Sequence, residues 1–403
     1  MVFIRCSQLL TPRGPLSGGV LVDGGQILAV CADGEPPPAA VLRARQVDLG
    51  ECLIAPGLVN AHTHIELSWM AAQRPSGGDY SGWLRELLAL QPSFSEPTAR
   101  EAARVEIAKL EMRGTVAVGD IGNDLWVAEL LAQSDLEGVL FHELLGRDEA
   151  RAEATFSAAE ARLAALTTAA GWRHTLAPHA PHTVSPTLLG LLARRARRLG
   201  APLSIHLAES QEEAAFLRGE GPFVELFQER NFGAPPATSA RSSTAVAAAA
   251  GVLMANTAAV HAVQLDDEDL KLLARSKATV VSCPRSNDYL GVGQPRLAEL
   301  LEAGVPLALG TDSLASAPDL DLFAEMQFLR QQHPQIAAQT VVQAATAGGA
   351  RALGLEDRFG QIAPGMSSAM IAIELPEGAD PYELLCSNPK RIQTVRSIER
   401  DKG

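Results

Sequence analysis

Two histidines, His62 and His64, are separated by one residue and follow an apolar run at residues 53–59. On an extended segment, side chains two positions apart point to the same face. Both imidazoles can therefore reach one metal ion from the end of a single strand. The chain has 9 histidines, so the pair alone is also compatible with a chance placement.

Two further candidate ligands, His206 and Asp312, each end an apolar run much later in the chain. Three neutral imidazoles and one carboxylate suit a divalent ion; Zn²⁺ is favoured and iron is the alternative. Such an ion lowers the pKa of a bound water toward about 7, which makes hydroxide available at neutral pH. His206 could instead be a core histidine whose hydrogen bonds are all made within the protein, and Asp312 could be a helix cap. A chance origin of the cluster would require both of these explanations and a chance placement of His62 and His64 as well.

The elements that must position these residues form a regular pattern. Between residues 53 and 355, β-type runs alternate with helical stretches, which predicts a parallel sheet covered by helices. Eight such units suggest a closed (β/α)8 barrel, in which the chemistry lies at the carboxyl ends of the strands. The expected strands are residues 53–64, 115–121, 138–145, 174–180, 202–208, 252–262, 278–283 and 305–312.

Local signals place some boundaries more sharply. Asp23-Gly24 lies between two β-type runs and predicts a hairpin. Ser185 before a proline predicts the start of a helix at 187–199, and Gly200 its end. The acidic group at 266–269 predicts the start of a helix over 265–277. Residues 234–243 look like a loop, and β-like sequence returns after residue 360.

Composition narrows the function classes. The chain has 403 residues, 47% of them hydrophobic and 20% charged, which is typical of a folded globular protein. Its formal net charge of −13 argues against a nucleic-acid partner, since phosphate binding depends on Lys and Arg. Five scattered cysteines without a C-x-x-C pair favour reduced thiols and a cytoplasmic location. Residues 244–263 are apolar but are better explained as a buried helix and strand than as a membrane span.

Several strings together resemble the amidohydrolase superfamily, in the branch of cytosine, guanine and adenosine-type deaminases and triazine hydrolases. The match runs along the whole chain, and the motifs are jointly specific. The strings are APGLVNAHTH at 55–64, HLAE at 206–209, SCPRSN at 282–287, GTDS at 310–313 and GQIAPG at 360–365.

The resemblance implies a distorted (β/α)8 barrel at residues 56–357 and a small β-sandwich built from residues 1–55 and 358–403. It implies one divalent metal ion, catalytic roles for three side chains, and attack of a metal-bound hydroxide with release of ammonia. Two-metal relatives use a carboxylated lysine, and no Lys lies between Gly114 and His206. The absence of lysine does not exclude Glu143 as a carboxylate that bridges two metal ions. The implied ligands are His62, His64, His206 and Asp312, and the implied catalytic residues are Glu209, His261 and Asp312.

In that chemistry Glu209 protonates a ring nitrogen, His261 steadies the developing charge, and Asp312 passes a proton to ammonia. Glu209 could instead be an ordinary glutamate in the first turn of a helix.

The strings HIELS at 64–68, YSGWL at 80–84 and APHAPHT at 177–183 resemble aminodeoxyfutalosine deaminases of menaquinone synthesis. This points to 6-amino-6-deoxyfutalosine as the substrate. Trp83 could instead be a core residue and Glu66 a loop anchor. Arg147 and Arg74 are candidate partners for the benzoate of that substrate, although both are also typical surface residues. The implied substrate contacts are Glu66, Trp83, Glu143 and His179.

Three positions depart from the family pattern. Ser282 stands where relatives commonly carry His, His182 replaces a frequent aromatic residue, and Met370 replaces a usual Asp. The first two are expected to bear on substrate choice. Other readings remain open at this point: hydrolysis of another aminated or chlorinated heterocycle, or a non-catalytic barrel scaffold. The sequence predicts a small-molecule substrate and no membrane or nucleic-acid partner, and it leaves a homodimer open.

Overall fold

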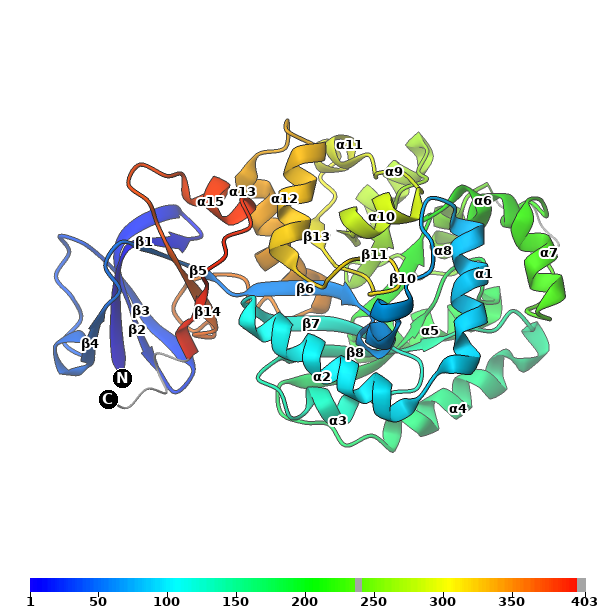
Figure 1. Cartoon of the computed structure of the whole chain (residues 1–403), viewed down its shortest axis with the longest axis horizontal. Helices are drawn as coiled ribbons and strands as arrows, with labels where there is room; N and C mark the ends of the chain where they lie inside the picture. The colour runs from blue at the N-terminus through cyan, green and yellow to red at the C-terminus, as the bar shows by residue number, and fades with distance from the viewer. Residues whose placement is uncertain (236–240, 397–403) are drawn as a thin grey trace.

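The computed structural model describes residues 1–235 and 241–396. Strands from both ends of the chain form one seven-stranded sheet, and the middle of the chain forms two parallel four-stranded sheets surrounded by helices (Figure 1). The fold is thus of the α/β type. Its helices are α1 (Tyr80–Leu90), α2 (Glu96–Met112), α3 (Ala128–Leu131), α4 (Ala152–Ala164), α5 (Pro186–Leu199), α6 (Gln211–Leu217), α7 (Pro222–Glu229), α8 (Ser243–Ala249), α9 (Asp267–Ser276), α10 (Pro284–Leu290), α11 (Leu297–Glu302), α12 (Leu322–Gln332), α13 (Ala338–Gln343), α14 (Gly349–Leu353) and α15 (Pro381–Cys386).

The terminal sheet joins segments that are far apart in the sequence. Its strand order is β15-β14-β5-β1-β2-β3, with β4 paired to β1. The predicted hairpin is confirmed between β2 and β3, where Gly24 and Gly25 both have positive φ. The strands are β1 (Val2–Thr11), β2 (Gly14–Asp23), β3 (Gln26–Ala32), β4 (Arg45–Asp48), β5 (Cys52–Pro56), β14 (Met370–Glu374) and β15 (Gln393–Thr394).

The two inner sheets are parallel throughout, with strand orders β6-β7-β8-β9 and β10-β11-β12-β13. Backbone hydrogen bonds connect their margins: the Thr311 N–H donates to the His62 carbonyl, and the His206 N–H donates to the His179 carbonyl. The strands are β6 (Leu58–Thr63), β7 (Thr115–Gly122), β8 (Glu137–Leu144), β9 (Trp172–Pro178), β10 (Leu203–Leu207), β11 (Thr257–His261), β12 (Thr279–Ser282) and β13 (Leu307–Leu309).

The first expected strand, residues 53–64, is divided in two. β5 pairs with the terminal sheet and β6 with the inner one, and Gly57 lies between them. A Cβ atom on Gly57 would stand 2.4 Å from Val116 Cγ1 and 2.7 Å from the Ala369 carbonyl oxygen. The chain therefore changes sheets at a residue without a side chain. The expectation of one continuous strand was wrong because an apolar run does not reveal which sheet each half joins.

Helix boundaries follow the capping residues. Ser185 caps α5 by accepting from the Leu188 N–H, and Gly200 ends the helix in the left-handed conformation. Asp266 and Asp269 form a capping box at the start of α9. Both predicted helices are confirmed to within two residues. The predicted loop 234–243 falls partly on residues 236–240, outside the described residues.

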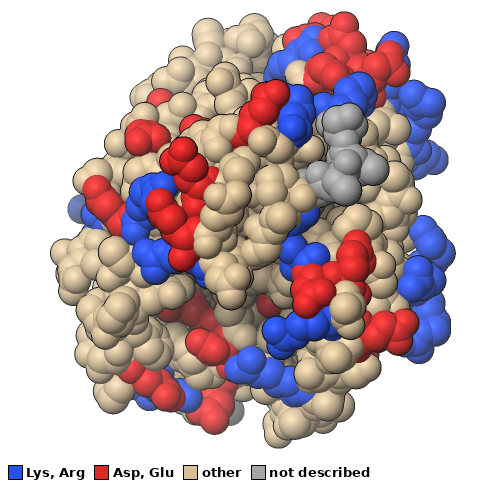
Figure 2. Space-filling model, turned by 90° about the vertical axis from the view of Figure 1, so that its right-hand side faces the viewer, with Lys and Arg blue, Asp and Glu red and all other residues tan. Residues whose placement is uncertain are grey.

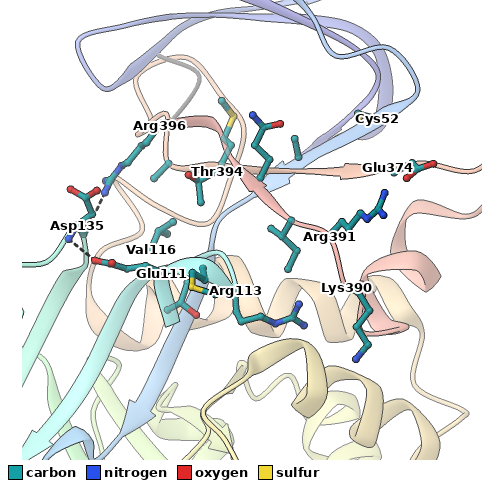
Figure 3. Close-up of a pocket in the computed structure, with 17 residues that line it drawn as sticks. Cys52, Glu111, Arg113, Val116, Asp135, Glu374, Lys390, Arg391, Thr394 and Arg396 are labelled. Atoms are coloured by element: carbon teal, nitrogen blue, oxygen red, sulfur yellow. Dashed lines mark hydrogen bonds between the residues drawn. The ribbon is translucent and has the colours of Figure 1, made fainter. Parts of the chain in front are cut away.

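A groove of about 790 Å³ lies between part of the terminal sheet and the inner strand β7 (Figure 3). It is lined by Cys52 and Met370 on the terminal sheet and by Val116 on β7. The Met370 departure thus belongs to this junction, and its side chain is buried in the strand β14. No helix among residues 1–235 and 241–396 is long and apolar enough to cross a membrane.

Candidate active site

Three buried imidazoles meet where the carboxyl ends of β6 and β10 approach each other. His64 Nε2 lies 3.1 Å from His62 Nε2 and 3.3 Å from His206 Nε2. Burial lowers the pKa of all three, that of His64 to about 3, so the rings are neutral at pH 7. Two ligands bound at 2.0–2.1 Å in tetrahedral geometry lie about 3.3–3.4 Å apart. The cluster therefore fits the nitrogen shell of a zinc-sized ion.

Asp312 adds a carboxylate to this cluster. Its Oδ1 lies 3.5 Å from His64 Nε2 and 3.8 Å from His62 Nε2. Its Oδ2 accepts hydrogen bonds from the hydroxyls of Ser286 and Ser316, at 2.6 and 2.8 Å. Burial acts to raise the pKa of Asp312, but the neighbouring imidazoles outweigh it and hold that pKa well below its usual value. The residue is an anion with one oxygen anchored and one facing the histidines.

Glu209 and His261 lie beside the cluster. Glu209 Oε1 is 3.5 Å from His261 Nε2, and Glu209 Oε2 accepts a 2.8 Å hydrogen bond from Tyr80. His261 Nδ1 lies 2.9 Å from the side-chain oxygen of Asn287. Burial raises the pKa of Glu209, which suits a group that gives and takes a proton near neutral pH.

The backbone is strained at these strand ends. His261 and Asp312 adopt positive φ values of 69° and 59°, and Ala208, next to Glu209, has a φ of 49°. Side chains other than glycine rarely occupy this region, and such residues concentrate at functional sites.

The four expected substrate contacts lie around the same strand ends, each with its own partner. Glu66 Oε2 accepts the N–H groups of Asn123 and Asp124, while its Oε1 is buried and has no hydrogen-bond partner within residues 1–235 and 241–396. Glu66 thus anchors the loop after β7 and keeps one oxygen free. Trp83 donates its indole N–H to the carbonyl of Ala315, so it also fixes the loop after Asp312.

The other two contacts flank His206. Glu143 Oε1 lies 3.4 Å from His206 Nδ1, and Glu143 Oε2 accepts from the Asn123 amide. Burial raises the pKa of Glu143 to about 7. The ring centroid of His179 is 4.8 Å from that of His206, and His179 Nδ1 lies 2.8 Å from the Thr183 hydroxyl. Glu143, His179 and His206 also bring ligand atoms within 4.8 Å of one another. His206 Nδ1, however, lies 3.0 Å from the His179 carbonyl, so it serves as a donor and not as a metal ligand.

Comparison with known proteins agrees with this geometry. The amidohydrolase family profile matches residues 53–400. The chain belongs to the amidohydrolase family. An aminodeoxyfutalosine deaminase from Deinococcus radiodurans is 34% identical over 87% of this chain and 85% of its own length. A 5-methylthioadenosine/S-adenosylhomocysteine deaminase from Syntrophobacter fumaroxidans is 30% identical over 89% and 80%. The fold matches Helicobacter pylori aminofutalosine deaminase in complex with methylthio-coformycin, with a TM-score of 0.85, 23% identity and 98% coverage of both chains.

The structure shows the surroundings of His182 and Ser282, the two departures from the amidohydrolase pattern that were expected to bear on substrate choice. His182 packs among Phe216, Phe223 and Phe227, and its Nδ1 is 3.5 Å from the buried carboxylate of Glu213. Ser282 is the last residue of β12. Its hydroxyl is buried and has no hydrogen-bond partner among the described residues.

The two arginines considered for substrate binding both contact protein carbonyls. Arg147 donates to the carbonyls of His182 and Ala234, and Arg74 donates to the carbonyl of Leu314. Both residues thus fix loops of this amidohydrolase.

Sequence analysis missed several residues that complete the site. Asn287 and Ser286 lie in the quoted SCPRSN string, but nothing in the string says that they bond His261 and Asp312. Asn123 has no motif at all, and only the structure shows that it connects Glu66 with Glu143. The end of the molecule that carries α6 and α7 is hollowed, with Lys and Arg interspersed among Asp and Glu (Figure 2). Lys and Arg also gather along the right-hand edge of this view.

Proposed function

We propose that this protein is a metal-dependent aminohydrolase that deaminates an adenine-like nucleoside, with 6-amino-6-deoxyfutalosine as its substrate. The observation that carries the proposal is the convergence of three neutral imidazoles and Asp312 beside Glu209, at the ends of parallel strands. Membership of the amidohydrolase family and two deaminase relatives support a hydrolytic deaminase. The aminodeoxyfutalosine deaminase at 34% identity supports the finer choice of substrate.

In the proposed site, His62, His64, His206 and Asp312 hold one divalent ion, for which zinc is favoured and iron is the alternative. The ion supplies hydroxide near neutral pH by lowering the pKa of water. The imidazoles are held neutral by burial and so keep lone pairs available as ligands. The Ser286 and Ser316 hydroxyls donate hydrogen bonds to Asp312 Oδ2 and so fix the orientation of the carboxylate. Hydrogen bonds of this kind commonly orient metal ligands.

The proposed reaction replaces the amino group of the ring with an oxygen from water. Glu209 takes the first proton of the attacking water and gives it to the ring nitrogen next to the attacked carbon; burial raises the pKa of Glu209, which favours its acceptance of that proton. Asp312 receives the second proton of that water and passes it to the departing ammonia. His261 hydrogen-bonds the oxygen and steadies the charge that develops there.

The proposed substrate contacts are Glu66, Trp83, Glu143 and His179. Glu66 keeps one buried oxygen without a hydrogen-bond partner in the described part of the chain, which suits a sugar hydroxyl or a ring nitrogen. His179 offers an imidazole beside His206, and Glu143 is a carboxyl with a pKa of about 7 that can donate or accept. Trp83 is partly buried and would form a wall for the base.

The proposal extends to the architecture and setting. The eight parallel strands would form a closed, distorted barrel at residues 56–357, and residues 1–55 and 358–403 would form a β-sandwich. All five cysteines are free, in keeping with a cytoplasmic enzyme, and the reaction would belong to menaquinone biosynthesis.

A second candidate is deamination of 5-methylthioadenosine or S-adenosylhomocysteine, favoured by the relative at 30% identity. The two substrates differ at the 5′ substituent, so competition distinguishes them. Zinc-loaded protein should release ammonia from 6-amino-6-deoxyfutalosine with a kcat/KM at least about 10-fold above that for 5-methylthioadenosine, S-adenosylhomocysteine and adenosine. The reverse order would assign the second candidate. Turnover of only a cytosine, guanine or triazine compound would overturn both.

A further inference from the structure

Tyr80 makes a contact with the proton-transfer residue that none of the assigned roles explains. It is the first residue of α1 and is buried. Its hydroxyl donates a 2.8 Å hydrogen bond to Glu209 Oε2, across 129 positions of sequence. Among the described residues this carboxylate oxygen is the hydroxyl's one hydrogen-bond partner. Burial and the adjacent carboxylate raise the pKa of Tyr80 well above its usual value, so the phenol keeps its hydrogen.

The two oxygens of Glu209 therefore have different surroundings. Oε2 is committed as an acceptor to Tyr80, and Oε1 lies 3.5 Å from His261 Nε2. His261 Nδ1 faces the Asn287 side-chain oxygen at 2.9 Å, which places a hydrogen on that nitrogen and a lone pair on Nε2. Oε1 and Nε2 are then two acceptors that face each other. One proton between them relieves the contact and gives Nε2 the hydrogen with which His261 steadies the developing charge.

We propose that Tyr80 is a positioning residue that keeps Glu209 Oε2 as an acceptor and so directs the transferable proton to Oε1, beside His261. The inference rests on the proposed role of Glu209. Without the phenol, either oxygen could carry the proton and the carboxyl could rotate. The proton would then be presented to the substrate in the right place for only part of the time.

The phenol is itself held in place. Its ring packs against Trp83 and Phe223, with centroids 5.6 and 5.8 Å apart. Trp83, one turn further along α1, is tied to the carbonyl of Ala315 in the loop after Asp312. The Glu209 backbone N–H is held by Glu213 Oε2 at 2.8 Å. Both ends of the Tyr80–Glu209 hydrogen bond are thus fixed by other contacts, as a preorganised proton donor requires.

The test compares Tyr80→Phe with Tyr289→Phe in the zinc-loaded enzyme with 6-amino-6-deoxyfutalosine. Tyr289 belongs to the same apolar cluster, but its hydroxyl donates to the carbonyl of Pro75. Tyr80→Phe should lower kcat about 10- to 100-fold, the loss expected when a buried acceptor is left without its donor. KM should change by less than about threefold, since substrate binding is untouched. Tyr289→Phe should leave both within about twofold of the parent.

A double-mutant cycle separates positioning from general damage. In a Glu209→Gln background, Tyr80→Phe should have less than about a twofold further effect, because its route through the glutamate is already gone. Full activity of Tyr80→Phe, or an equal loss in both backgrounds, would overturn the inference. If Tyr80→Phe fails to fold, 3-fluorotyrosine at position 80 should shift the pH profile of kcat, and an unchanged profile would overturn it. Failure of the proposed function would instead appear as absence of ammonia release by the parent enzyme.

Discussion

Replacement of Glu209 by Gln should lower kcat by about 10²- to 10⁴-fold, the usual contribution of a positioned acid or base. Gln preserves the shape of the side chain and the acceptor for Tyr80, but it cannot give a proton to the ring nitrogen. Glu209 is not a predicted metal ligand, so zinc content should stay at about one ion per chain. Steady-state kinetics and metal analysis of the same preparation check both statements.

A matched control for this change is Glu212→Gln. Glu212 lies in the first turn of α6, three residues after Glu209, and its side chain is partly exposed. This variant should keep kcat and zinc content within about twofold of the parent. Substantial activity in Glu209→Gln would rule out the proton-transfer role. Loss of zinc in that variant would move Glu209 from proton transfer to the metal site.

Replacement of His206 by Ala should remove the metal and with it the activity. His206 supplies one of the three converging Nε2 atoms, and its Nδ1 is already used by the His179 carbonyl. Mutation of a residue that only hydrogen-bonds a metal ligand typically lowers metal affinity about 10- to 100-fold. Loss of the ligand itself should therefore weaken zinc binding by more than about 100-fold. Zinc titration with a competing chelator measures the affinity, and activity should fall in parallel.

The matched control is His333→Ala, since His333 follows α12 and lies outside the cluster. The parent should also retain zinc at pH 6. The lowered pKa values mean that the ligand imidazoles stay neutral to a lower pH than a free imidazole does, and the pKa of His64 is about 3. Protons therefore compete with the metal less than they would at free imidazoles. Retention of tight zinc binding by His206→Ala would show that the ligand set is wrong.

The sequence predicts the strand ends better than it predicts the contacts between them. His62, His64, His206 and Asp312 each follow an apolar run, and parallel strands bring such ends to one side of a sheet. That prediction needs only the local pattern of apolar residues in each segment. It does not reveal that the first run changes sheets at Gly57, because the residues on both sides of that glycine, 53–56 and 58–59, are apolar.

Contacts between distant segments escaped prediction for a similar reason. Tyr80 and Glu209 are joined by a hydrogen bond across 129 positions, and neither residue type demands the other. The positive φ values of His261 and Asp312 are also invisible in the sequence, since local preferences would favour glycine there. Surrounding packing imposes them. The Trp83 indole illustrates the same limit, because its Ala315 partner is a backbone carbonyl that any residue could supply.

The most direct test of the account is the source of the new oxygen atom. Zinc-loaded protein should convert 6-amino-6-deoxyfutalosine in ¹⁸O-labelled water to a product that carries one solvent oxygen at the former amino position, with one ammonia released per product. Mass spectrometry and an ammonia assay measure the two quantities, and removal of the metal should abolish both. Failure to turn over this nucleoside, or a product without solvent oxygen, would contradict a hydrolytic deaminase built on the His62, His64 and His206 site.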